Sequence, residues 1–267
     1  MLKKIGIKDP EKQMLKLMES GAVPYRGVKQ KDVRNALEER FEPQVLKSMT
    51  DEASLAKRYP GVPHEEAAYR EMRRLTDELN SSDKGNLVED WYERMYAQRR
   101  AGSSNRPESR QHQKVSAAEW NKNRPASEQI KKDRFIDRVD SVNIGGKEKP
   151  ALHEIKSTKG KLQERDKEQF EDMMKVAKAE RNGVEARGAD GRMQKVDQVV
   201  YTLTDPRGVA KNEDWIVDQL TKYRNNLSFE VFDAQGKRMM IDARSLKRSK
   251  DGELVLPDGI RNRLGLK

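Results

Sequence analysis

The spacing of hydrophobic residues changes twice along the chain. Between Pro10 and about Asn80, apolar residues recur every three to four positions in short runs, a spacing typical of amphipathic helices. Glycines and prolines interrupt the runs, which predicts three or four helices separated by turns. None of these runs carries the paired polar groups that a catalytic site needs. We therefore expect residues 1–80 to form a helical accessory domain.

Residues 81–245 show the pattern of an α/β domain. A helix-start signal at 81–83 precedes a helix with Leu87, Trp91 and Met95 on one face. The elements expected after it are strands at 134–142 and 151–157, a helix from 162 to about 180, a strand at 196–204, a helix at 212–225 and a hairpin of 227–232 with 239–241. This order predicts a mixed sheet flanked by helices.

Two stretches have no sustained hydrophobic period. Residues 98–131 hold few apolar side chains, so we expect a long basic loop or a partly disordered insertion. Residues 246–267 are basic and weakly patterned, which predicts a C-terminal tail.

Composition limits the kinds of site that the chain can build. It has no cysteine, which excludes disulfides, cysteine-ligated zinc, iron–sulfur clusters and thiol catalysis. Its three isolated histidines cannot form a multi-histidine site at helical spacing, so any metal would be a hard ion held by carboxylates. No window approaches the roughly 18 apolar residues of a membrane span. The N-terminus lacks the apolar segment of a standard secretory signal, so we expect synthesis in the cytoplasm.

The formal net charge of +10 is concentrated in two places. Residues 99–134 hold ten Lys/Arg against four Asp/Glu, and residues 237–267 hold nine against four. Such stretches indicate surfaces for a polyanion, because phosphate contacts release counterions; solvated loops are the alternative. The candidate nucleic-acid contacts are Arg99, Arg100, Lys114, Trp120, Lys122, Arg124, Lys131 and Lys132. DNA is the expected partner.

One triplet carries the clearest chemical signal. Glu154-Ile155-Lys156 is the only acidic-x-Lys triplet in the chain, and it lies on the strand that follows the one bearing Asp137. Residues two apart on a strand share a face, and a hairpin brings the neighbouring strand alongside. Two carboxylates can bind a hard divalent ion, and a nearby lysine can orient a water or help to deprotonate it. The alternative is a solvated ion pair worth less than ~1 kcal/mol.

This arrangement resembles the PD-(D/E)XK nuclease superfamily, which has the restriction-endonuclease-like fold. The resemblance covers residues 84 to about 204 and depends on the order of four elements: a helix with a glutamate, a strand with an aspartate, a strand with the Glu-x-Lys triplet, and a helix with a glutamine. Ile136 stands where the family name has proline, which many members also lack. The resemblance implies a mixed sheet of that fold and a Mg²⁺ or Mn²⁺ cofactor.

The resemblance also implies roles for five residues. It makes Asp137 and Glu154 metal ligands and Lys156 the residue that orients the attacking water. Glu89 would be an auxiliary acid, and Gln169 would contact substrate or water from the following helix.

Two of these positions have rivals in the sequence. Asp140 competes with Asp137, although alternation along a strand puts the two on opposite faces, and we prefer Asp137. Gln163 competes with Gln169 in the same way.

We expect a metal-dependent nuclease that hydrolyses phosphodiester bonds, with DNA as its substrate. Its small size and helical extension are similar to those of toxin effectors in interbacterial competition. Such a toxin acts on DNA in the cytoplasm of the cell into which it is delivered, and an acidic immunity or inhibitor protein keeps it harmless. A DNA-processing nuclease of a phage or mobile element is the rival expectation. A non-catalytic nucleic-acid-binding protein, with a structural triplet, is the alternative from another class.

Overall fold

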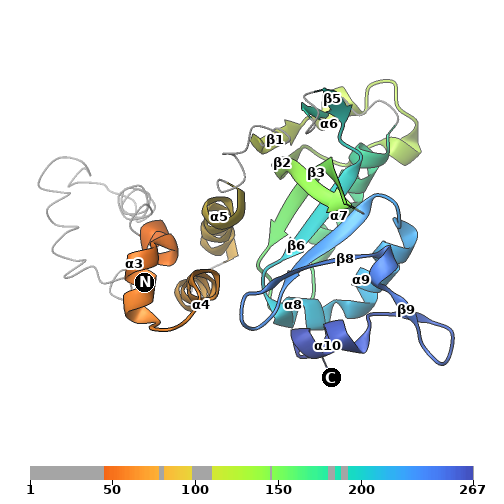
Figure 1. Cartoon of the computed structure of the whole chain (residues 1–267). Helices are drawn as coiled ribbons and strands as arrows, with labels where there is room; N and C mark the ends of the chain where they lie inside the picture. The colour runs from red at the N-terminus through yellow and green to blue at the C-terminus, as the bar shows by residue number, and fades with distance from the viewer. Residues whose placement is uncertain are drawn as a thin grey trace, which may run out of the picture. The chain divides into compact units, whose positions relative to one another are not determined.

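The computed structural model describes residues 45–77, 81–97, 110–144, 146–179, 184–187 and 192–266 (Figure 1). Its contacts divide the chain into two compact units, Met1–Met95 and Tyr96–Lys267, and each is described by itself. The boundary lies later than the one expected at residue 80, because the helix that begins at Ser81 groups with the N-terminal helices. The helices expected before residue 45 lie outside the described residues.

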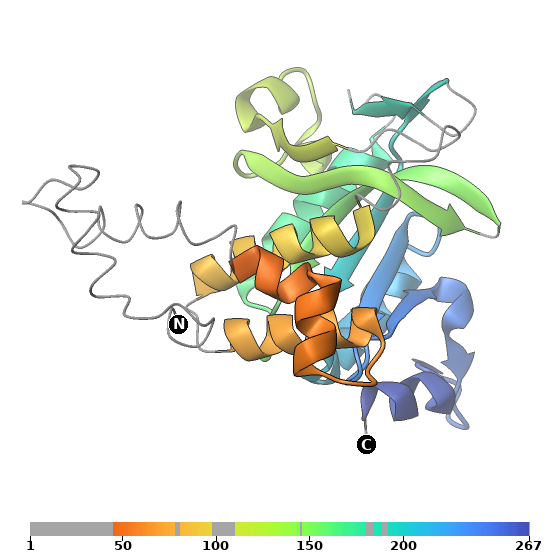
Figure 2. The same ribbon diagram turned by 60° about the vertical axis from the view of Figure 1, so that its left-hand side comes forward.

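The first unit is helical, as its hydrophobic period predicts. Residues 45–50 are helical, and the helices that follow are α3 (Glu52–Arg58), α4 (His64–Thr76) and α5 (Ser81–Tyr92). Helix α4 contacts both α3 and α5 (Figure 2). Asp51 caps α3 by accepting a hydrogen bond from the Ser54 amide. Tyr69 of α4 packs against Trp91 of α5, with 6.1 Å between the ring centroids. The apolar face predicted for α5 is therefore a packing face.

The second unit contains a six-stranded open sheet in the order β1-β2-β3-β6-β7-β8. The strands are β1 (Arg110–Val115), β2 (Arg134–Ile144), β3 (Lys147–Lys156), β6 (Gln198–Leu203), β7 (Leu227–Phe232) and β8 (Arg238–Asp242). The first three are antiparallel, β6 and β7 run parallel to β3, and β8 is antiparallel to β7. The sheet is therefore mixed, and the expected α/β class with flanking helices is confirmed.

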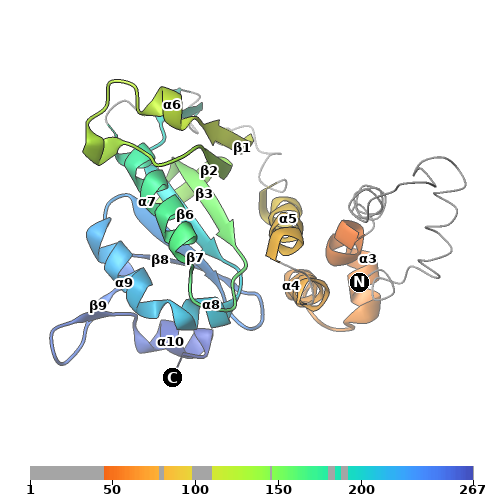
Figure 3. The ribbon, with the colours of Figure 1, turned by 180° about the vertical axis from the view of Figure 1, so that it is seen from behind.

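Helix α7 (Glu164–Lys178) connects the parallel strands β3 and β6, and α9 (Glu213–Lys222) connects β6 and β7 after the short α8 (Pro206–Lys211). Figure 3 shows α7 and α9 on the same face of the sheet. Aromatic rings fill the space beneath them: Phe170 of α7 lies edge-on to Tyr201 of β6 and to Trp215 of α9, at 5.5 and 5.0 Å. Among the described residues, no helix has the length and apolar character needed to cross a membrane.

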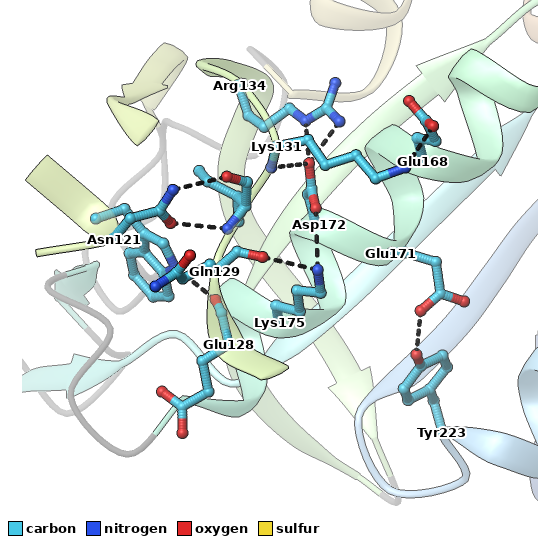
Figure 4. A network of polar contacts seen from close by, with 12 residues as sticks. Asn121, Glu128, Gln129, Lys131, Arg134, Glu168, Glu171, Asp172, Lys175 and Tyr223 are labelled. Atoms are coloured by element: carbon cyan, nitrogen blue, oxygen red, sulfur yellow. Dashed lines mark hydrogen bonds and ion pairs between the residues drawn. The ribbon is translucent and has the colours of Figure 1, made fainter. Parts of the chain in front are cut away.

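The stretch expected to be a basic loop is folded from residue 110 onward. It contains β1, α6 (Ala117–Trp120) and a 3-10 turn, Ala126–Glu128. Side-chain hydrogen bonds stabilise this segment, which has no regular spacing of hydrophobic residues. Asn121 donates to the Ile130 carbonyl and accepts from the Ile130 amide (Figure 4). Strand β1 is a polar edge strand that pairs through its backbone with β2. Residues 98–109 of this stretch lie outside the described residues.

The stretch expected to be a basic tail is also folded. It forms a hairpin of β9 (Lys247–Arg248) and β10 (Leu254–Val255), followed by α10 (Asp258–Leu264). Leu256 and Leu264 are buried in the main core, so a few well-spaced leucines anchor a segment whose other residues are polar. A further small hairpin joins β4 (Glu185–Arg187) and β5 (Met193–Lys195).

Gly208 of α8 allows a close approach between this helix and the loop that follows β3. A Cβ atom at position 208 would lie 2.2 Å from the Thr158 carbonyl oxygen. We expect Gly208→Ala to lower the free energy of unfolding by about 1–3 kcal/mol, because one of the two backbones must move. Urea denaturation measures this change. In the control Gly259→Ala the new Cβ meets no atom within 4 Å, and equal stability losses in both variants would contradict the prediction.

Candidate active site

The end of β3 carries a buried carboxylate with a lysine beside it. The Glu154 side chain lies on the sheet face covered by α7, and residue 154 is 0% exposed. Its Oε1 lies 2.5 Å from Nζ of Lys156, which follows on the same face of the strand. An ionised carboxylate is stable at such a position only if it is paired and hydrogen-bonded.

Gln169 of α7 completes a triangle of contacts. Its Nε2 donates a hydrogen bond of 2.6 Å to Glu154 Oε1, and its Oε1 accepts one of 3.2 Å from Lys156 Nζ. The side-chain amide therefore forms a hydrogen bond with each member of the ion pair. The three groups hold each other in one arrangement.

Asp137 reaches the same place from β2. Its Oδ2 accepts a hydrogen bond of 2.7 Å from the backbone amide of Ile155. The register of β2 with β3 ends at the pair of Arg138 and His153, and Asp137 and Glu154 are the next residues along the two strands. Two carboxylates from adjacent strands thus lie at the end of β3, as the sequence predicts.

The charge balance at this point is negative. Burial by itself lowers the pKa of Lys156, but the charges of Glu154, Asp137 and Asp166 outweigh it and raise that pKa above its ordinary value. Lys156 is therefore protonated at neutral pH and acts as a hydrogen-bond donor. Three carboxylates within its electrostatic reach leave a net negative site that favours a cation.

The structure separates the rival residues. Asp140 accepts from the Ser141 amide at 2.7 Å and lies 3.5 Å from the guanidinium of Arg138, with both side chains buried. Gln163 is the N-cap of α7 and forms a capping box with Asp166. Neither Asp140 nor Gln163 has a hydrogen bond or ion pair with Glu154 or Lys156 among the described contacts, whereas Asp137 and Gln169 contact the Glu154–Lys156 segment directly.

Glu89 lies on α5, in the first unit. Its proposed role as an auxiliary acid stays a prediction.

The exposed lysines predicted to contact nucleic acid differ in how far they are neutralised. Lys114 lies 2.8 Å from Asp133, and Lys131 lies 2.6 Å from Glu168 (Figure 4). Lys122 and Lys132 are exposed and form no salt bridge within the described residues. Those two are the stronger candidates for phosphate contacts, while Arg99 and Arg100 lie outside the described residues.

Trp120 is placed differently from the expectation that it contacts nucleic acid. It is only 7% exposed, and its Nε1 donates to the Glu128 carbonyl at 2.9 Å. Arg124 lies over the ring at 3.7 Å from its centroid and also pairs with Glu128. These contacts show Trp120 as a core residue of its segment. The exposed ring near the site is Phe135, 57% exposed and opposite Lys114 in the β1–β2 register.

The donor set suits a metal that keeps much of its own water. In the part of the chain that the structure describes, no group of three or more His, Cys, Asp or Glu side chains is arranged to hold a metal ion. Mg²⁺ is commonly bound through one or two carboxylates, with water and phosphate oxygens as its other ligands. Asp137 and Glu154 fit that requirement, provided that Glu154 shares its charge between Lys156 and the cation.

Comparisons of the chain with protein-family models, curated proteins and solved structures find no match. The chemistry of the site is therefore argued from its geometry. A buried anionic pair beside a protonated lysine and an amide can bind a cation and orient a polar ligand such as water or a phosphate oxygen.

Two residues at the site were not identified from the sequence. Asp166 precedes Gln169 by one helical turn, and this i, i+3 spacing is a signal that places both on one face of α7. Tyr201 is the partner of Glu154 in the β3–β6 register. Nothing in the local sequence of β6 indicates that pairing.

Lys156→Met removes the ammonium that balances Glu154 while keeping an unbranched side chain. We expect a loss of about 3 kcal/mol in the free energy of unfolding at pH 7, because a buried carboxylate then lacks its cation. Protonation of Glu154 removes the uncompensated charge, so the difference from wild type should shrink as the pH falls to 5. Urea denaturation at several pH values measures this trend.

The matched control is Lys167→Met, which breaks an exposed pair with Glu164 and should cost less than ~1 kcal/mol. A Lys156→Met protein as stable as wild type at pH 7 would show that Glu154 does not need this lysine.

Proposed function

We propose that this protein is a metal-dependent nuclease that hydrolyses phosphodiester bonds in DNA, and that its second unit has a restriction-endonuclease-like fold. The observation that carries the proposal is the contact of Glu154 with Lys156 and Gln169, with the Asp137 carboxylate bound to the intervening Ile155 amide. Residues from two strands and a helix converge here. A surface ion pair would not need this degree of burial or a shared amide partner.

The order of elements supports the proposal. A helix, α5, precedes the aspartate strand β2, the Glu-x-Lys strand β3, the glutamine helix α7 and the parallel strand β6. This is the order on which the resemblance to the PD-(D/E)XK superfamily depends.

Each residue has a chemical task in this proposal. Asp137 and Glu154 would hold Mg²⁺ or Mn²⁺, which when bound supplies Lewis-acid polarisation of a phosphoryl oxygen. Lys156 would orient the attacking water or a phosphate oxygen by donating hydrogen bonds. Gln169 would keep Lys156 and Glu154 aligned. If Glu154 shared its charge with a bound cation, the charged form of Lys156 would be less stabilised than it is without the cation.

We propose DNA as the substrate because the basic segment before β2 leads directly to Asp137. This chemistry is consistent with two biological roles. One is a toxin effector that is delivered into a target cell and restrained by an acidic immunity or inhibitor protein. The other is a DNA-processing nuclease of a phage or mobile element. A non-catalytic nucleic-acid-binding protein is the second candidate. It is favoured by one observation: Lys156 and Gln169 already contact Oε1 of Glu154 without any ligand.

Incubation of supercoiled plasmid with Mg²⁺, with Mn²⁺ and with a chelator tests the nuclease. We expect metal-dependent nicking or linearisation that falls by about 100-fold in Glu154→Gln and in Asp137→Asn, because each loses a charged ligand. Glu164→Gln is the control, since this α7 carboxylate is 85% exposed and contacts Lys167. The binding protein would be supported instead if wild type left the plasmid intact with either metal while wild type and all variants retarded the plasmid equally in a gel.

The DNA-binding surface is tested by salt dependence. We expect Lys122→Ala/Lys132→Ala, made in the Glu154→Gln background, to weaken binding of all sequences alike. The slope of log Kobs against log salt should fall by about 2, because each of the two lysines neutralises one phosphate. Lys57→Ala/Lys211→Ala removes the same charge from exposed positions outside the segment and should leave the slope nearly unchanged. Equal slopes in both double variants would place the DNA elsewhere.

A further inference from the structure

Tyr201 stands beside the acidic site in the sheet. It is the β6 partner of Glu154 on β3, and both residues are 0% exposed. Partners in adjacent strands lie side by side on one face of a sheet, so the phenol and the carboxylate are neighbours. The Tyr201 ring packs edge-on against Phe170 and Trp215, at 5.5 and 5.9 Å. These contacts account for the ring but not for the hydroxyl group.

The Tyr201 hydroxyl is buried and has no hydrogen-bonding partner among the described residues. A buried hydroxyl without a hydrogen bond is costly, and in native proteins such a group commonly binds an ordered water, an ion or a ligand. Phenylalanine would fill the same space in this aromatic cluster without that cost. The hydroxyl therefore indicates that something polar binds at this point.

The surroundings indicate which kind of hydrogen bond the hydroxyl can make. Burial first, and then the charges of Glu154, Asp166 and Asp137, raise the pKa of Tyr201 well above its ordinary value. A tyrosine hydroxyl is protonated at neutral pH in any case, so it can donate a hydrogen bond. The charged groups that act on this hydroxyl are carboxylates. A water between the hydroxyl and a carboxylate can accept a hydrogen bond from Tyr201 and donate one to a carboxylate oxygen.

We propose that Tyr201 is a positioning residue of the acidic site, whose hydroxyl binds a buried water that fixes the Glu154 carboxylate for cation binding. Lys156 and Gln169 both contact Glu154 at Oε1. A hydrogen bond from the β6 side adds a constraint on the rotation of the carboxylate that those two contacts do not provide. This inference rests on the proposed function.

The test compares two Tyr→Phe substitutions in the full chain. Tyr201→Phe removes only the hydroxyl, and Tyr223→Phe removes one that donates to Glu171 at 2.5 Å. We expect Tyr201→Phe to bind Mn²⁺ about 10- to 100-fold more weakly by calorimetry, and to lower kcat on plasmid with KM unchanged. Its melting temperature should stay the same or rise. Tyr223→Phe should lower the melting temperature and leave Mn²⁺ binding and kcat unchanged.

Each other result has a definite meaning. A Tyr201→Phe protein that binds Mn²⁺ and cleaves as wild type does overturns the inference and leaves the nuclease proposal intact. A Tyr201→Phe protein that loses stability together with Mn²⁺ affinity shows a packing role only, and also overturns it. A wild-type protein that neither binds Mn²⁺ nor cleaves contradicts the proposed function itself, and the inference with it.

Discussion

The burial of the Glu154 carboxylate is the constraint on which the site depends. Removing a charge from water costs several kcal/mol unless a partner of opposite charge and hydrogen bonds replace the water. Lys156 and Gln169 supply both, at 2.5 and 2.6 Å from the same oxygen atom. Lys156 comes from the same strand as Glu154, whereas Gln169 comes from helix α7. The charge state of the site therefore depends on where α7 lies on the sheet.

Contacts along its length hold α7 in place. The capping box of Gln163 and Asp166 defines its first turn, and Phe170 inserts into the aromatic cluster over β6 and β7. Further along, Asp172 forms a buried ion pair with Arg134 at the start of β2, with 2.5 Å between Oδ2 and Nη2 (Figure 4). The strand that carries Asp137 is thereby tied to the helix that carries Gln169. The same polar contacts that stabilise the unit also align the residues of the site.

The sequence predicts the inner strands and the main helices well, because their apolar residues follow the periods of buried elements. It does not predict β1, whose residues are polar and whose pairing depends on the backbone of β2. It also misplaces Trp120, since a polar segment can bury a ring by hydrogen-bonding its own backbone. The Glu154–Lys156 pair and Asp137 are visible as a local triplet and a neighbouring strand. Tyr201 is not, because its position depends on a parallel register between distant segments.

The most direct test of the account is a crystal grown or soaked in Mn²⁺ and measured at the manganese absorption edge. We predict an anomalous peak within coordination distance of both Asp137 and Glu154, with Lys156 turned toward a water or phosphate oxygen. Lack of a peak there at millimolar Mn²⁺, with Lys156 still bound to Glu154, would contradict the claim that this buried pair is a metal site.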